Sequence, residues 1–180
     1  MSVDAPTSVH QIDWLTWTPT ERATLMFVLD GDQILLIRKK RGLGAGKINA
    51  PGGRMEPGES PEQCAIRETI EELGVTPLSP ALRGRQRFHF VDGYQLTVFC
   101  FLSYAHRGTA IETEEARPRW TSVDAIPFEQ MWADDALWVP MMLRGEAFDG
   151  RYIFDGDTMV DHAFRDPPRL ADIAADRPDI

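Results

Sequence analysis

The chain has 180 residues, of which 43% are hydrophobic, and this suits one domain with a buried core. Its 19 Lys and Arg against 28 Asp and Glu give a net charge of −9, which disfavours binding of long nucleic acid because nothing general attracts a phosphate backbone. Two cysteines, Cys64 and Cys100, make no disulfide framework and favour a reducing compartment such as the cytoplasm. No signal-peptide pattern opens the sequence, and no segment approaches the roughly 20 apolar residues of a membrane span.

The chain divides into an extension, one domain and a tail. Residues 1–20 mix polar residues with Trp14 and Trp17, and we expect little regular structure there apart from anchoring by the two indoles. The expected domain covers residues 21–165. The tail, residues 166–180, is rich in Pro, Asp and Arg and is expected to stay mobile.

Short apolar runs between turn signals predict strands in the domain. The turn signals are Asp30-Gly31-Asp32, Asp92-Gly93 and Asp155-Gly156-Asp157. The expected strands lie at residues 23–29, 33–37, 85–91, 95–104, 119–123, 151–154 and 158–162. Many strands and few helices indicate an α/β domain with a mixed sheet flanked by helices.

The clearest helix is predicted for residues 61–73. The segment Ser60-Pro61-Glu62-Gln63 has the form of a capping box with proline at the first helical position. Gly74 is a favoured residue directly after a helix. A second segment, residues 126–143, is predicted to be helical in parts.

Three carboxylates share one side of the first helix. Because residues advance by about 100° along a helix, Glu68, Glu71 and Glu72 project one turn apart from the same side. The opposite side is expected to pack on the sheet and carries Ile66, Thr69, Ile70 and Leu73. Two interpretations remain open: a solvated acidic face, or a site for a hard divalent cation that offsets the repulsion between the carboxylates.

The acidic stretch has a fixed spacing of charged and glycine positions. It reads Gly53-x5-Glu59-x7-Arg67-Glu68-Thr69-Ile70-Glu71-Glu72-Leu73-Gly74-Val75. This spacing resembles the Nudix box, Gly-x5-Glu-x7-Arg-Glu-U-x-Glu-Glu-x-Gly-U, where U is aliphatic. Every charged and glycine position matches, and Thr69 stands where an aliphatic residue is usual. The resemblance implies an α/β/α sandwich with a mixed sheet, in which the box forms a loop-helix-loop catalytic motif.

The Nudix resemblance also implies a divalent metal, Mg²⁺, with Mn²⁺ as an alternative. Gly52 and Gly53 let the backbone bend sharply and bring carbonyl oxygens close to the acidic helix. The implied metal ligands are the Gly52 carbonyl and the carboxylates of Glu68, Glu71, Glu72 and Glu115.

Further roles concern proton transfer and orientation. Glu59 is expected to bond Arg67, which then orients the catalytic side of the helix. A carboxylate must take the proton of the attacking water. Glu71 is the first candidate and Glu115 the second, although Glu115 also fits a surface acid in the run 112–115.

Outside the box the chain resembles the oxidised purine nucleoside triphosphatases of the mammalian MutT-homologue branch. Matching blocks lie at residues 41–49, 117–120, 126–135 and 154–158. The substrate site implied by this resemblance consists of Thr24, Lys39, Asn49, Phe88, Phe90, Trp132, Asp134 and Asp135. The branch usually has other residues at Leu43, Ile48, Ala50-Pro51 and Ala116.

The implied substrate residues have a chemical logic. Two adjacent carboxylates in an apolar pocket, Asp134 and Asp135, resist double ionisation, so one offers a donor and the other an acceptor to a base edge. Exchange of that proton would admit both 8-oxoguanine and 2-hydroxyadenine. Asn49 adds an amide contact and Trp132 a stacking face. Lys39 is the leading cation for phosphate, with its basic neighbours Arg38 and Lys40 and the loop residue Lys47 as further candidates.

We therefore expect a monomeric enzyme that acts on a small nucleotide in nucleotide-pool sanitation. It would hydrolyse 8-oxo-dGTP or 2-hydroxy-dATP to the monophosphate and pyrophosphate, which makes it a nucleoside triphosphate diphosphatase. One alternative is a Nudix pyrophosphohydrolase of another nucleotide, such as an ordinary or methylated dNTP, a dinucleoside polyphosphate or ADP-ribose. The other alternative is a non-catalytic nucleotide sensor.

Overall fold

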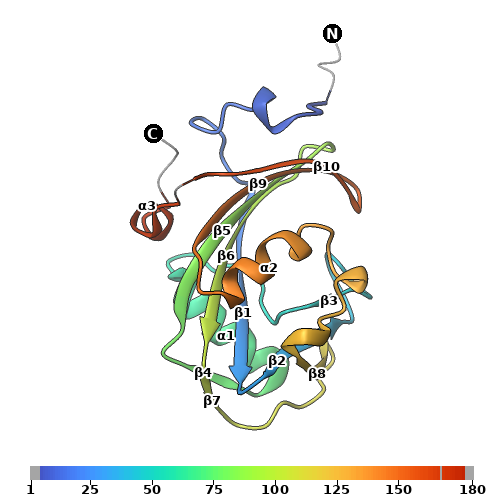
Figure 1. Cartoon of the computed structure of the whole chain (residues 1–180), viewed down its shortest axis with the longest axis vertical. Coiled ribbons are helices and arrows are strands. Elements are labelled where there is room, and N and C mark those ends of the chain that lie inside the picture. Colours follow the sequence, from blue (N-terminus) through green and yellow to red (C-terminus); the bar gives the residue numbers. More distant parts are fainter. Residues whose placement is uncertain (1–4, 167, 177–180) are drawn as a thin grey trace.

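The computed structural model describes residues 5–166 and 168–176 and contains two sheets (Figure 1). The strands are β1 (Glu21–Asp30), β2 (Gln33–Lys39), β3 (Ile48–Asn49), β4 (Thr76–Leu78), β5 (Ala81–Phe90), β6 (Gln95–Ser103), β7 (Ala105–Arg107), β8 (Ala116–Ser122), β9 (Phe148–Asp155) and β10 (Thr158–Phe164). The helices are α1 (Pro61–Leu73), α2 (Asp135–Leu143) and α3 (Leu170–Ala174), with single 3-10 turns η1 (Val9–Gln11), η2 (Val123–Ala125) and η3 (Phe128–Gln130).

The eight-stranded sheet is mixed, as the sequence predicts. Its order is β10-β9-β5-β6-β1-β2-β3, and β8 also pairs with β2. The β1–β6 and β5–β9 pairs are parallel, and the other pairs are antiparallel. Strands β4 and β7 form a separate two-stranded sheet. Sequence analysis missed β3, β4 and β7 because two or three residues are too few to show an alternating pattern.

The sheet carries an apolar cluster on each face. In β1, Met26 and Val28 point to one face and Phe27 and Leu29 to the other, as the two-residue period of a strand requires. Helix α1 covers the first face, and α2 covers the second through Trp138 and its neighbours (Figure 1). The result is the expected α/β sandwich, in which the acidic helix α1 forms one of the outer layers.

Helix α1 has the predicted bounds, but its buried side is rotated from the expected one. Its buried residues are Cys64, Ala65, Thr69, Glu72 and Leu73. Ile70 is 43% exposed, so the expectation that it packs on the sheet is wrong. The buried stripe turns towards Glu72 because this end of α1 borders a cavity as well as the apolar face of the sheet.

The N-terminal extension has little regular structure and is anchored as predicted. Trp14 is buried, and its Nε1 donates to the Val9 carbonyl at 2.8 Å. Val9 and Trp14 pack on Ile153 of β9, and the ring of Trp14 lies 5.5 Å from the guanidinium of Arg87. The extension therefore covers the outer part of the sheet (Figure 1).

The predicted mobile tail has local structure where it is described. Residues 170–174 form α3, and Ile173 is fully buried in the apolar cluster that also contains Met26 and Phe101. Arg22 Nε and Asp176 Oδ2 form an ion pair at 2.6 Å. The expectation of mobility is wrong for this segment, because Ile173 and the ion pairs of Asp176 with Arg22 and Arg85 fix it to strands distant in the chain. Residues 177–180 lie outside the described part.

The described segments include no helix of the length and apolar character that crossing a membrane requires.

Candidate active site

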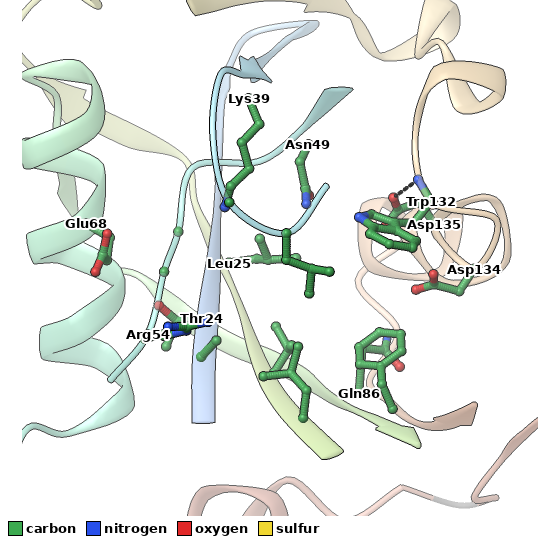
Figure 2. A pocket seen from close by; sticks show the side chains of 18 of the residues that line it. Thr24, Leu25, Lys39, Asn49, Arg54, Glu68, Gln86, Trp132, Asp134 and Asp135 are labelled. Atoms are coloured by element: carbon green, nitrogen blue, oxygen red, sulfur yellow. Dashed lines mark hydrogen bonds between the residues drawn. The ribbon is translucent and has the colours of Figure 1, made fainter. Parts of the chain in front are cut away.

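One cavity of about 430 Å³ lies between α1, the curved sheet and the segment that leads into α2 (Figure 2). Its walls include residues of six strands of the large sheet, the glycine loop after β2 and residues 52–54. Most of the predicted site residues line it, namely Thr24, Lys39, Asn49, Gly52, Glu68, Glu72, Phe88, Phe90, Glu115, Trp132, Asp134 and Asp135. Glu59, Arg67 and Glu71 lie beside the cavity without lining it.

Both ends of α1 are set by local contacts. Ser60 Oγ accepts from the Gln63 amide at 3.2 Å, and Gln63 Oε1 accepts from the Ser60 amide at 2.9 Å, which completes the predicted capping box. The helix ends at Gly74, whose φ of 70° is left-handed. With both ends fixed, Glu68 and Glu72 face the cavity one turn apart.

Arg67 connects three carboxylates at the edge of the cavity. Its Nε and Nη2 donate to the two oxygens of Glu59 at 2.7 and 2.9 Å. This paired contact lowers the pKa of Glu59 to about 2. Arg67 Nη1 also donates to Glu68 at 2.8 Å and to Glu71 at 3.1 Å. Arg67 therefore orients two of the predicted metal ligands, of which Glu71 is 58% exposed.

Glu72 is the most buried carboxylate of the helix. It is 2% exposed, and its Oε2 accepts from the Gly52 amide at 3.0 Å. Burial raises its pKa to about 7; the Gly52 amide and Lys39 oppose this rise, and the charges of Glu68 and Glu115 add to it. Burial likewise raises the pKa of Glu68. Negative charge is thus unfavourable at this corner unless a cation is bound.

The donor set fits a hard divalent cation. In the described part of the chain, no three His, Cys, Asp or Glu side chains are already assembled as a metal site. At this corner of the cavity the charges of Glu68 and Glu115 act on Glu72. All three side chains supply only oxygen donors, which Mg²⁺ and Mn²⁺ prefer. A cation at this place would offset both their burial and their mutual repulsion.

Two glycines allow the loop before α1 to approach its neighbours closely. A Cβ added at Gly53 would overlap the carboxylate of Glu68, and one added at Gly52 would overlap the carbonyl of Thr24. The Thr24 amide in turn donates to the Gly53 carbonyl at 2.9 Å. The glycines therefore place backbone atoms of this loop against the acidic side of α1.

A second pair of carboxylates lies at the other end of the cavity. Asp134 and Asp135 are each 2% exposed. Trp138 Nε1 donates to Asp134 Oδ2 at 2.9 Å, and the Trp132 amide donates to Asp135 Oδ2 at 3.0 Å. Burial raises the pKa of Asp134 to about 6 and that of Asp135 well above its usual value, with the charge of Asp134 as the second cause. The pair therefore favours a form that keeps a proton, and it can both donate and accept.

The sequence also matches a protein family over most of this fold. Residues 19–142 match the family model described as NUDIX domain. This match contains the whole of α1, the glycine loop before it and five of the six strands that line the cavity; β9 lies beyond it. The chain belongs to the Nudix family.

Named relatives of this Nudix chain cover most of its length. It is 43% identical over 141 residues to the oxidized purine nucleoside triphosphate hydrolase of Danio rerio, a match that covers 77% of this chain and 90% of the relative. The Mus musculus protein of the same name is 39% identical, in a match that covers 79% of this chain and 93% of that relative. A crystal structure of a MutT protein from Bacillus halodurans has a TM-score of 0.73 and 30% identity, with 83% of this chain and 99% of that chain covered.

Aromatic side chains form the apolar walls of the Nudix cavity. The Trp132 ring meets Phe154 edge-on at 5.6 Å, and Lys47 Nζ lies 4.8 Å from its centre. The glycine loop packs on the same indole, since a Cβ at Gly44 would come within 2.9 Å of Trp132 Nε1. Figure 2 shows this ring beside Asp135. Trp132 is thus held in place and offers a flat surface to the cavity.

The basic residues near the cavity differ in whether they already bind other groups of the protein. Lys39 lines the cavity (Figure 2) and acts on Glu72 electrostatically. The other predicted cations bind protein groups: Arg38 donates to the Gly46 carbonyl, Lys40 pairs with Glu112, and Lys47 pairs with Asp157. Lys39 remains the leading candidate for contact with a phosphate.

Sequence analysis missed several residues that line the cavity. They include Leu25, Arg54, Gln86, Tyr94, Leu96 and Trp138. Gln86 precedes Phe88 and Phe90 at the two-residue period of β5, so strand periodicity could have placed it on the same face. Arg54 lies beside β1 and pairs with Glu21 of that strand, a contact that no local pattern reveals.

Proposed function

We propose that the chain is a Mg²⁺-dependent diphosphatase of oxidised purine nucleoside triphosphates. It hydrolyses 8-oxo-dGTP or a related nucleotide to the monophosphate and pyrophosphate. The main support is that one cavity joins an acidic corner, suited to a metal and a polyphosphate, to a buried Asp pair suited to a base. The names of the Danio rerio and Mus musculus relatives agree with this substrate class.

The base would bind at the end formed by Asp134, Asp135 and Trp132. Stacking on Trp132 supplies apolar contact, and the proton shared by the buried Asp pair supplies a donor beside an acceptor. An oxidised purine differs from the parent base in which edge atoms carry protons. The Asp pair can therefore contribute to selection of the modified base.

The polyphosphate would lie over the acidic corner. Gly52, Glu68, Glu71, Glu72 and Glu115 are the proposed ligands of Mg²⁺, with Mn²⁺ as the alternative. The metal would neutralise the polyphosphate and activate an attacking water. Lys39, which reaches the same corner, would contact a phosphate oxygen.

Cleavage breaks the anhydride bond between the α and β phosphorus atoms. The oxygen of water becomes part of one product, and a carboxylate must accept the proton that the water loses. Glu71 is the first candidate for this base and Glu115 the second. Glu115 lines the cavity, whereas Glu71 is exposed and bonded to Arg67, so the two have to be compared directly.

A substrate panel tests the proposed function. It sets 8-oxo-dGTP, 2-hydroxy-dATP, N6-methyl-dATP, dGTP, dATP and ADP-ribose side by side, with and without Mg²⁺, and resolves the products by chromatography. We expect kcat/KM for an oxidised purine triphosphate to exceed that for dGTP by at least about tenfold, and turnover to stop without the metal. Equal rates on dGTP would remove the sanitising function, and faster cleavage of ADP-ribose would assign another substrate.

The identity of the general base that takes the proton from water is tested by comparing Glu71→Gln with Glu115→Gln. We expect Glu71→Gln to lower kcat by about 100-fold or more with unchanged thermal unfolding, because the amide cannot take a proton. Glu62→Gln changes an exposed glutamate in the first turn of the same helix and serves as the control, with an effect below about twofold. A larger loss in Glu115→Gln than in Glu71→Gln would move the base role to Glu115.

A further inference from the structure

Gln86 is a buried amide that forms part of the cavity wall. It lies in β5 on the same face as Phe88 and Phe90, and its exposed fraction is 0%. Within residues 5–166 and 168–176, neither its Nε2 nor its Oε1 has a hydrogen-bond partner. A primary amide offers two donors and one acceptor oxygen, and its burial without partners is unfavourable. This side chain is therefore matched to a group that the described protein does not supply.

Two other unsatisfied polar atoms belong to Asp134, which also lines the cavity, and to Tyr152, which lies beside Gln86 without lining the cavity. The Tyr152 hydroxyl and Asp134 Oδ1 are also buried without a hydrogen-bond partner among the described residues. Gly150 is the β9 residue opposite Gln86, and a Cβ there would overlap both Gln86 Oε1 and the Tyr152 hydroxyl. Figure 2 shows Gln86 and Asp134 on the same side of the cavity. We call Gln86, Tyr152 and Asp134 the polar floor.

Two members of the polar floor, Gln86 and Tyr152, come from the neighbouring strands β5 and β9. Tyr152 pairs with Phe88 in the β5–β9 register, and their rings stack at 5.0 Å, which fixes the direction of the tyrosine. The missing side chain of Gly150 leaves the space that the amide and the hydroxyl occupy. Leucine or phenylalanine could fill such space without unsatisfied atoms, so packing alone gives no reason for glutamine.

Asn49 is the other primary amide on the described cavity wall, and it is less available. Its Oδ1 accepts from the Ala50 amide at 2.8 Å. Gln86 Oε1 accepts from no described group. Of the two amides, Gln86 is the one whose donor and acceptor atoms are both buried without a described partner.

We propose that Gln86 is a specificity-determining residue that binds the N7–H and C8=O groups of an 8-oxopurine. This inference rests on the proposed function and names the base lesion within it. Oε1 accepts from N7–H, and Nε2 donates to the C8 oxygen, so the amide meets an amide-like edge with two parallel hydrogen bonds. An unmodified purine has no proton on N7 and a C–H at C8. It can accept one bond from Nε2, and Oε1 then stays unsatisfied.

The proposal separates 8-oxopurines from other modified purines. The N7–H and C8=O pair is present in 8-oxo-dGTP and in 8-oxo-dATP. In 2-hydroxy-dATP the added oxygen is on C2, and the N7 edge is that of an ordinary adenine. Loss of the Gln86 amide should therefore act on the two 8-oxo nucleotides and spare the selection of 2-hydroxy-dATP.

The test compares kcat/KM ratios in the wild type and in Gln86→Met, which has similar length and no amide. We expect the ratios of 8-oxo-dGTP to dGTP and of 8-oxo-dATP to dATP to fall by about tenfold or more, and the ratio of 2-hydroxy-dATP to dATP to change by less than about threefold. Gln33→Met makes the same change at the start of β2, away from the cavity, and should leave all three ratios unchanged. Unchanged 8-oxo ratios in Gln86→Met, or an equal fall in all three ratios, would overturn the proposal.

A second measurement separates binding from structural support. Without nucleotide, Gln86→Met should unfold at the same temperature as the wild type or higher, because it removes an unsatisfied buried amide. Gln86→Leu repeats the comparison if the methionine variant does not fold. Failure of both variants to fold, or a lower unfolding temperature in both, would identify a structural amide and overturn the proposal.

The wild-type panel distinguishes failure of this inference from failure of the proposed function. If the wild type shows no preference for any oxidised purine, the proposed function fails and the inference falls with it. If the wild type prefers 8-oxo-dGTP and the Gln86 variants keep that preference, the inference alone is wrong.

Discussion

Glu59, beside the cavity, and the Asp pair that lines it have opposite electrostatic settings. Around Arg67, a cation holds the pKa of Glu59 at about 2, so that carboxylate stays charged. Around Asp134 and Asp135, burial without a cation in direct contact favours the protonated form. The same chemical group, a carboxyl, thus serves two purposes, because the local surroundings decide its charge.

Asp134 should make the stability of the protein depend on pH. Its pKa rises from 3.8 to about 6 on folding, so the native state holds a proton in this window that the unfolded chain has lost. The contribution of Asp134 to stability therefore falls as pH rises from about 4 through about 6. In Asp134→Asn this loss is absent, so the unfolding free energy relative to the wild type should increase between pH 4 and pH 7, by an amount on the order of 1 kcal/mol or more.

Urea unfolding at several pH values measures the Asp134 effect. The control is Asp124→Asn, a change of an exposed aspartate in η2, which should follow the wild-type curve. Parallel curves for Asp134→Asn and the wild type would mean that Asp134 is charged in the free protein.

At the scale of elements, α1 was the most predictable part of the molecule. Its start at Ser60-Pro61, its end at Gly74 and its bounds agree with the structure, because capping signals are local in the chain. Strands β3, β4 and β7 were not predicted, and β5 begins at Ala81 where residue 85 was expected. Short strands depend on their partners for pairing, and the chain near them carries no signal of which partner that is.

The capping box of α1 should contribute measurable stability. Ser60→Ala removes the oxygen that accepts from the Gln63 amide, and we expect the unfolding free energy to fall by about 1 kcal/mol. Ser8→Ala removes the same kind of cap from η1, which has only three residues, and should cost less. Urea denaturation measures both changes. An equal loss in the two variants would show that the length of the capped element is unimportant.

At the scale of the whole molecule, both ends of the domain pack on its sheet. The extension places Trp14 on the outer face of β9, and the tail places Ile173 of α3 in the apolar cluster on the face that α1 covers. The adjoining sheet contains the ion pair of Arg85 and Asp149, at 2.8 Å, with both side chains buried. These contacts cover the surface opposite the base end of the cavity, so they support the fold without taking part in substrate binding.

Removal of the Trp14 side chain should separate stability from specificity. We expect Trp14→Ala to lower the unfolding free energy by about 3 kcal/mol or more, because a buried indole and its packing on Ile153 are lost. The preference between 8-oxo-dGTP and dGTP should not change, since Trp14 lies on the other face of the sheet. Leu15→Ala, at a 58% exposed neighbour, is the control. A changed preference in Trp14→Ala would mean that the extension reaches the substrate.

Local and regularly spaced information was readable in the sequence by itself. The Nudix box, the helix that carries it, most strands and the mixed sheet follow from patterns that lie within a few neighbouring residues. The predicted base-site residues also line one cavity. Asn49, Trp132, Asp134 and Asp135 could be predicted because they lie in sequence blocks that resemble a known family. The predicted bond between Glu59 and Arg67 is present for the same reason.

Only the tertiary structure decided which side chains are buried and which are left without partners. Burial of Glu72 and exposure of Ile70 depend on how α1 is rotated against the sheet, and the fixed position of Ile173 depends on a strand far away in the chain. The unsatisfied amide of Gln86 exists because β5 and β9 bring it beside Gly150 and Tyr152. Burial and hydrogen bonding are relations between distant segments, so they are defined only after the chain has folded.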